Sequence, residues 1–106
     1  MLLIELKREL PCPSIYGRAL ALDMAETVSE DASVCKEHWQ LTGTMKIYGN
    51  ESLVAMEVSE KDESHSVLHL KMLSPAPRLS INGQSRALGF LADAIEQLLE
   101  NSLNNK

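Results

Sequence analysis

The stretch NGQSRALGFLADAIEQLLENSL, residues Asn82 to Leu103, has the apolar spacing of one long amphipathic helix. Its apolar side chains recur at i, i+3, i+4 and i+7, so they share one stripe along the helix. The stripe consists of Leu88, Leu91, Ala92, Ile95, Leu98 and Leu99. Asn82 is the expected N-cap, and Gly83 lets the chain turn into the helix. Such a helix spans roughly 30 Å, so we expect the preceding chain to supply a sheet beneath it.

The middle of the chain alternates apolar and polar residues, as half-buried strands do. Residues 39–48 form the longest alternating run, and Gly49-Asn50 fits the central pair of a two-residue hairpin loop. Residues 68–72 continue the inward face in a further strand. The sequence therefore predicts an antiparallel meander before the last helix.

The predicted hairpin loop also fixes a register between its two strands. A loop centred on Gly49-Asn50 places Met45 opposite Val54 and Leu41 opposite Val58. Apolar residues then meet apolar residues on one side of the pair, and this agreement between turn and side-chain parity favours the assignment.

The N-terminal part of the chain indicates a strand followed by a second helix. Residues 2–9 alternate, and Pro11 and Pro13 end the strand because each lacks the N–H that a ladder needs. After Ser14, an expected N-cap, four apolar residues fall four apart: Tyr16, Leu20, Met24 and Val28. This spacing favours a helix over residues 15–29. A strand is the alternative, because apolar residues also alternate from Leu20 to Met24.

Length and composition are those of one α+β domain covering residues 1–106, with a frayed end at 101–106. The chain has 106 residues, of which 44% are hydrophobic. The expected order is strand, helix, three strands and a long C-terminal helix. The sheet is expected to be antiparallel and to pack against that last helix.

Charge and hydropathy exclude several classes of partner. The net charge is -5, and the 10 Lys and Arg residues are scattered rather than clustered, which argues against nucleic acid and anionic membranes. No segment approaches the roughly 20 apolar residues of a membrane span. We therefore expect a cytoplasmic protein in which Cys12 and Cys35 are free thiols.

No motif for catalysis, a cofactor or a metal is present in the sequence. Nucleophile elbows, phosphate-binding glycine loops and dinucleotide fingerprints are all missing. His65 and His69 are four residues apart, but on a strand that spacing corresponds to roughly 13 Å, too far to hold one ion. We predict no metal and no cofactor, and the sequence favours a non-catalytic role without deciding it.

The order of the elements resembles the helix-grip fold of the START and Bet v 1-like superfamily. The resemblance rests on a first strand that ends in Glu9-Leu10-Pro11-Cys12-Pro13, then a helical stretch, an antiparallel meander and the long last helix. It implies a curved sheet around that helix and a cavity for lipids, hormones or polyketides. It implies no catalytic residue.

The first functional hypothesis is a small apolar ligand held between the sheet and the C-terminal helix. Trp39 is the only tryptophan and falls on the apolar side of the longest alternating run, and methionines nearby can adapt to a bound molecule. The predicted pocket wall consists of Trp39, Leu41, Met45, Met56, Leu91 and Ile95.

The alternative hypothesis is a homodimer or an adaptor, similar to small acidic chaperones, that buries an apolar flank of the helix. Ala87, Phe90 and Ala94 lie to the side of the core stripe and form the predicted interface. Apolar groups exposed on a small acidic domain can mark such an interface.

Overall fold

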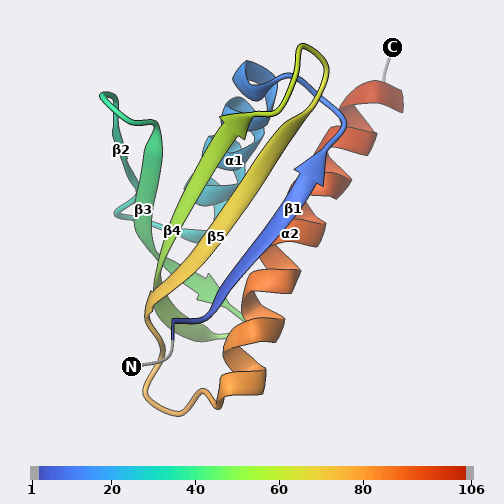
Figure 1. Cartoon of the computed structure of the whole chain (residues 1–106). Helices are drawn as coiled ribbons and strands as arrows, with labels where there is room; N and C mark the ends of the chain where they lie inside the picture. The colour runs from blue at the N-terminus through green and yellow to red at the C-terminus, as the bar shows by residue number, and fades with distance from the viewer. Residues whose placement is uncertain (1–2, 105–106) are drawn as a thin grey trace.

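A computed structural model, which describes residues 3–104, shows an antiparallel five-stranded sheet with both helices on one face (Figure 1). In chain order the elements are β1 (Glu5–Leu10), α1 (Ser14–Val28), β2 (Ser33–Cys35), β3 (Gln40–Ile47), β4 (Asn50–Glu60), β5 (Ser66–Ser74) and α2 (Ile81–Asn104). The strand order in the sheet is β1-β5-β4-β3-β2. The predicted class, an α+β fold with a long C-terminal helix on an antiparallel sheet, is confirmed.

β1 pairs with β5 along its full length, so the first strand of the chain forms one edge of the sheet. This long-range pairing places β1 beside α2 (Figure 1). Leu2, which belongs to the predicted first strand, lies outside the described residues. β2 is a short edge strand that the sequence pattern does not indicate, because three residues are too few to show a period.

The β3–β4 hairpin has a different loop from the predicted one. Tyr48 and Gly49 form its central pair, with φ angles of 53° and 79°, and positive φ at both positions is the mark of a type I′ turn. The predicted Gly49-Asn50 loop is therefore wrong, since Asn50 already pairs with Ile47. The register moves by two residues, which preserves the faces: Leu41 lies opposite Met56 instead of Val58.

α1 confirms the helical interpretation of residues 15–29. Pro13 occupies the N-cap position in place of Ser14, and its fixed φ suits the start of a helix. The buried side is Gly17, Leu20, Ala21 and Ala25. Small residues on this side bring the helix close to the sheet: a Cβ at Gly17 would lie 3.1 Å from a Val58 methyl carbon.

α2 begins earlier and ends later than its apolar stripe suggests. Ser80 Oγ accepts a hydrogen bond of 3.0 Å from the Gly83 N–H, so Ser80 is the N-cap and Asn82 is not. The helix continues through Asn104, so the first residues of the expected frayed end are helical. Residues 105–106 lie outside the described part. Neither described helix combines the length and hydropathy needed to cross a bilayer.

The core fills the space between the sheet and the two helices. The predicted stripe of α2 faces it, with Leu88, Leu91, Ala92, Ile95 and Leu99 buried and Leu98 half-buried. The sheet contributes residues from β1, β3, β4 and β5, and α1 contributes its small side. The other face of the sheet has no helix over it (Figure 1).

Candidate functional site

The interior part of the predicted pocket wall is tightly packed. Leu41, Met45, Met56, Leu91 and Ile95 are all 0% exposed and belong to one continuous core. Two hollows of the described residues lie elsewhere and touch none of these five residues. A ligand could contact them only if the helix and the sheet moved apart, so their role in binding stays a prediction.

Trp39 lies outside the layer that α2 covers. It is part of the turn before β3, and its half-buried ring packs against the edge of the core. The Arg18 guanidinium carbon lies 5.8 Å from the ring centroid, and Arg18 Nε donates a hydrogen bond to the Val58 carbonyl. Trp39 thus joins the β2–β3 hairpin to α1, and the cation over its ring stabilises this contact.

An open hollow of about 520 Å³ lies where the tip of the β3–β4 hairpin meets the first half of α2. Its lining combines aromatic, aliphatic, glycine and charged residues. These residues are Tyr48, Leu79, Gly83, Arg86, Gly89, Phe90 and Asp93. Phe90 is the only one that the sequence analysis assigns to a site, as part of an interface.

An aromatic pair forms one side of this hollow. The Tyr48 and Phe90 ring centroids lie 4.7 Å apart with an interplanar angle of 54°, within the range of favourable tilted ring contacts. Tyr48 is nevertheless 73% exposed and Phe90 39% exposed. The pair therefore joins the hairpin to the helix and still presents aromatic surface to solvent.

Opposite charges mark the two ends of the hollow. Asp93 and Glu96 both bind the Arg8 guanidinium of β1, the latter at 2.8 Å, and the hydrogen bonds that Arg8 donates to these two carboxylates raise its pKa. Arg86 forms no ion pair with any residue that the structure describes. Asp93 is thus neutralised by Arg8, whereas Arg86 is a cation available to another molecule.

The predicted interface residues do not form one flank. Ala87 is only 5% exposed and Ala94 is half-buried, whereas Phe90 is exposed. Ala87 precedes Leu88 and lies one turn before Leu91, so it joins the buried stripe rather than the side of the helix. Ala87 is thus buried within this chain and its interface role stays a prediction, whereas Phe90 has the exposure that an interface requires.

A second hollow, of about 560 Å³, lies between the end of α1 and the uncovered part of β3. Asp31 closes part of it: its carboxylate accepts hydrogen bonds from the Thr44 N–H at 2.7 Å and the Thr44 hydroxyl at 3.0 Å. These bonds lower the pKa of Asp31 and cap an edge N–H that would otherwise be free. Within residues 3–104, no group of three or more His, Cys, Asp or Glu side chains is placed to hold a metal.

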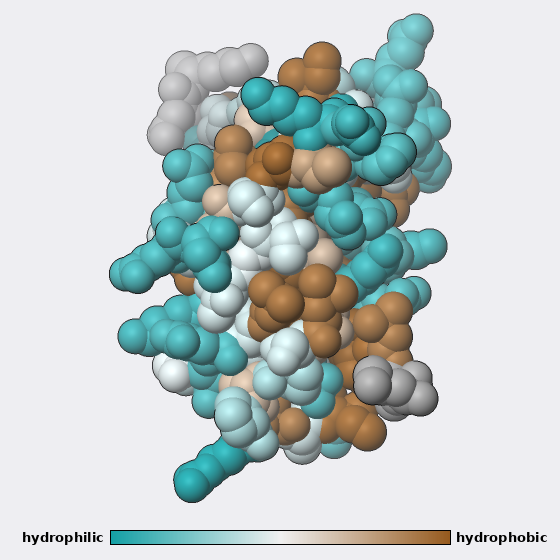
Figure 2. Space-filling view, turned by 90° about the vertical axis from the view of Figure 1, so that its left-hand side faces the viewer, coloured by the Kyte–Doolittle hydropathy of each residue, from teal (hydrophilic) through white to brown (hydrophobic). Residues whose placement is uncertain are grey.

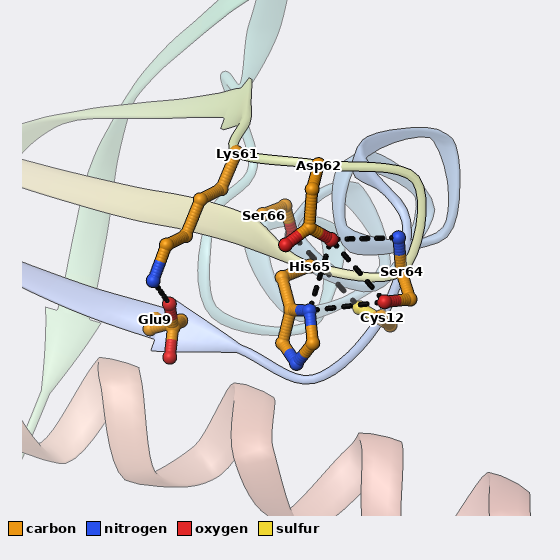
Figure 3. Close-up of polar contacts among 7 residues, drawn as sticks. All are labelled: Glu9, Cys12, Lys61, Asp62, Ser64, His65 and Ser66. Atoms are coloured by element: carbon orange, nitrogen blue, oxygen red, sulfur yellow. Dashed lines mark hydrogen bonds and ion pairs between the residues drawn. The ribbon is translucent and has the colours of Figure 1, made fainter.

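Asp62, Ser64 and His65 gather in the β4–β5 turn without the geometry of a catalytic triad (Figure 3). The Asp62 carboxylate and the Ser64 hydroxyl both contact His65 Nδ1, at 2.9 and 3.0 Å. A triad needs the two ring nitrogens to serve different partners. Asp62 instead holds the turn, since the Ser64 N–H donates to it and lowers its pKa to about 2.

The cysteines do not add a reactive group near this turn. Cys12 and Cys35 are both free, as expected from the sequence. Cys12 Sγ is buried 4.0 Å from Ser66 Oγ (Figure 3), and burial raises the pKa of its thiol. A protonated buried thiol is a poor nucleophile.

Solved structures with the same architecture support the fold. A START superfamily protein from Mycobacterium smegmatis matches with a TM-score of 0.61 and 11% identity, over 93% of this chain and 97% of that chain. The di-domain ARO/CYC BexL from the BE-7585A biosynthetic pathway matches with a TM-score of 0.54 and 9% identity. That match covers 98% of this chain but 44% of the other, so this chain spans less than half of BexL.

The sequence itself matches no protein-family model and no curated protein. At 9 to 11% identity the likeness concerns the fold alone. It confirms the predicted fold-level resemblance: the chain has the helix-grip architecture found in START superfamily proteins.

Proposed function

We propose that this protein binds a small apolar molecule, without catalysis, in the hollow between the β3–β4 hairpin tip and α2. The observation that carries the proposal is the Tyr48–Phe90 pair, which exposes aromatic surface inside a concave site. Apolar surface removed from water contributes about 25 cal/mol per Å². A ligand that covers both rings therefore gains free energy that the unbound protein leaves unused.

The backbone of Tyr48 supports the same proposal. A tyrosine with φ of 53° occupies a left-handed conformation that favours glycine or asparagine, at a cost on the order of 1 kcal/mol. A bulky side chain at this place is unnecessary for the turn itself. Its ring contributes by reaching Phe90, and strain of this kind is concentrated at functional sites.

The hollow also adjoins the interior site that the sequence predicts. Tyr48 directly follows the buried Ile47, and Phe90 directly precedes the buried Leu91. Separation of the two rings would expose the end of the layer between the sheet and α2. Met45 and Met56 lie in that layer, and their flexible side chains suit a core that adapts to a ligand.

The helix-grip fold agrees with a binding role by analogy only. The hypothesis that START-like folds suggest, a small apolar ligand beside the last helix, is the one that the hollow favours. Trp39, Leu41, Met45, Met56, Leu91 and Ile95 remain candidates for the deeper contacts of such a ligand.

Self-association is the second candidate function, and exposed apolar residues favour it. Leu3 is 50% and Leu73 46% exposed, and the sheet face opposite the helices is uncovered (Figure 1). On the side where β2 and β3 lie, Figure 2 shows a compact hydrophobic patch near the centre and further hydrophobic residues near the top and the lower right edge. Phe90 would take part in either function.

Native mass spectrometry of protein purified from its own host tests the binding function. We expect a bound mass of small-molecule size, which Phe90→Glu removes because a carboxylate cannot enter an apolar contact without losing hydration. Leu103→Glu is the matched control: it lies on the same helix, is 53% exposed and is outside the hollow. A clean unbound mass, with no thermal shift across a panel of apolar compounds, would contradict the function.

Sedimentation at several concentrations separates the alternative. Self-association that Phe90→Glu abolishes would favour the interface, whereas a monomer at all concentrations leaves the ligand site as the function of Phe90.

A further inference from the structure

Gly89 is a glycine that the fold itself does not require. It lies inside α2, where glycine is the least favourable residue after proline. A Cβ placed on Gly89 would meet no atom within 4 Å. Its φ is not in the left-handed region. Alanine would therefore fit this position and stabilise the helix.

Other glycines in contact with the core have a visible steric reason. A Cβ at Gly17 would crowd Val58 and Ser66 at 3.1 Å, and a Cβ at Gly43 would lie 3.0 Å from the Ala32 Cα. The Gly89 backbone faces the hollow instead. A bare backbone at a concave surface is what close approach by another molecule requires.

The surroundings of Gly89 define the shape of that molecule. Phe90 and Tyr48 supply an aromatic wall beside the glycine, and Leu79 supplies an aliphatic one. A flat ring can lie over a backbone without a Cβ and contact an aromatic wall at the same time. Bulky saturated groups make a smaller contact with the same surface.

The charged side chains along α2 indicate which chemical group one end of the bound molecule carries. Arg86 and Asp93 are seven residues apart on the helix, which corresponds to roughly 10 Å along its axis. Asp93 is bonded to Arg8, whereas Arg86 has no ion-pair partner among residues 3–104. A guanidinium presents paired N–H donors that match the geometry of a carboxylate.

We infer that the hollow binds a planar, apolar molecule with an acidic group, whose ring lies on the Gly89 backbone and whose carboxylate binds Arg86. This inference rests on the proposed function and specifies the ligand class. It makes Gly89 the floor of the site, Tyr48 and Phe90 its wall, and Arg86 its anchor.

Two probes and two substitutions test the ligand class in the full chain. The probes are 2-naphthoate, which is planar and anionic, and 2-naphthamide, which has the same ring without the charge. Gly89→Ala adds a methyl group to the floor, and Arg86→Gln removes the cation. Gln97→Ala, an exposed position of α2 outside the hollow, is the control. Binding is measured by isothermal titration calorimetry and stability by thermal unfolding.

The expected result separates stability from binding. Gly89→Ala should raise the melting temperature by a few degrees, because alanine favours a helix. It should also weaken the binding of both probes. Arg86→Gln should weaken the affinity for 2-naphthoate by about two- to fivefold, the contribution of an exposed ion pair. The affinity for 2-naphthamide should not change. Gln97→Ala should bind both probes as the wild type does.

Four other results would overturn the inference. Equal binding of the two probes by the wild-type protein would contradict the role of Arg86. Full binding by a more stable Gly89→Ala variant would contradict the role of Gly89. Both results leave the proposed function intact. Self-association that Gly89→Ala disrupts assigns the hollow to a second copy of the chain. If neither probe binds and no bound mass is found in protein from its host, the proposed function fails together with the inference.

Discussion

The two sides of α2 differ in what fills the space next to them. On the inner side, Leu91 and Ile95 are fully buried in the core cluster. On the outer side of the first half, Phe90 and Gly89 line an open hollow beside the hairpin tip. The inner side maximises packing, whereas the outer side keeps an exposed ring, a strained tyrosine and a helix glycine.

This difference indicates where the chain gives up stability. An exposed aromatic pair, a non-glycine residue at positive φ and a glycine inside a helix each lower the free energy of unfolding. All three occur at one place. Sites that depart from the local rules of stability are expected to be functional, and we therefore place the ligand at the outer hollow.

Shortening a buried side chain on the inner side of α2 should cause the largest change in the free energy of unfolding. Leu91→Ala removes a fully buried side chain of the core, so we expect a loss of about 2–5 kcal/mol in the free energy of unfolding. Denaturant unfolding measures it. Leu103→Ala, at a 53% exposed position of the same helix, is the control and should change stability by about 0.5 kcal/mol or less. Similar losses in the two variants would contradict the contrast between the two sides.

A pair of glycine substitutions sharpens the comparison. Gly17→Ala and Gly89→Ala both gain helix propensity, but only the first crowds the core, at 3.1 Å from Val58 and Ser66. We expect Gly17→Ala to be less stable than the wild type and Gly89→Ala more stable, with a difference of about 1–3 kcal/mol between them. Chemical denaturation of both variants in the same buffer gives this difference. Destabilisation by Gly89→Ala would show that the fold requires that glycine.

The ion pairs at the Asp93 end of the hollow should have a smaller effect. Arg8 joins β1 to α2 through Asp93 and Glu96, at partly exposed positions. Arg8→Gln should cost up to about 1 kcal/mol at low ionic strength and less at high salt, because solvent and ions screen such pairs. Unfolding at two salt concentrations checks this. A loss that does not depend on salt would assign Arg8 a packing role instead.

The β4–β5 turn should make the free energy of unfolding depend on pH only in the acidic range. Asp62 has a folded-state pKa of about 2, below its usual value of 3.8. A lowered carboxyl pKa gives stability that is present above pH 4 and is lost as pH falls through 2. Asp62→Asn should therefore reduce the dependence of the urea midpoint on pH in this range. A dependence equal to that of the wild type would exclude Asp62 as its source.

The sequence was sufficient for the architecture because the architecture depends on periodicity. The stripe through Leu88, Leu91 and Ile95 and the alternation in β3 and β4 each repeat often enough to identify an element. The same periodicity could not fix the hairpin register, because a shift of two residues keeps every side chain on its face. Tyr48 has a positive φ and contacts Phe90, a residue distant in sequence, and neither feature follows from local spacing.

The candidate site was harder to predict for a related reason. The hollow combines Tyr48 from a turn, Leu79 from a loop and one side of α2, and no spacing rule connects them. Among the lining residues, the sequence indicated only Phe90, which was predicted as part of an interface because it lies to the side of the core stripe. Trp39 suggested a pocket by its position in the alternation, but that alternation extends one residue beyond the start of β3.

Titration of the ¹⁵N-labelled protein with 2-naphthoate, followed by amide NMR spectra, tests the central claim most directly. We expect the largest shifts at Gly83, Gly89 and Phe90 of the outer side of α2 and at Gly49 of the hairpin tip, with small shifts at Leu41 and Met56. Saturable shifts centred on Leu41 and Met56, with Gly89 unchanged, would place the ligand in the core and contradict the account.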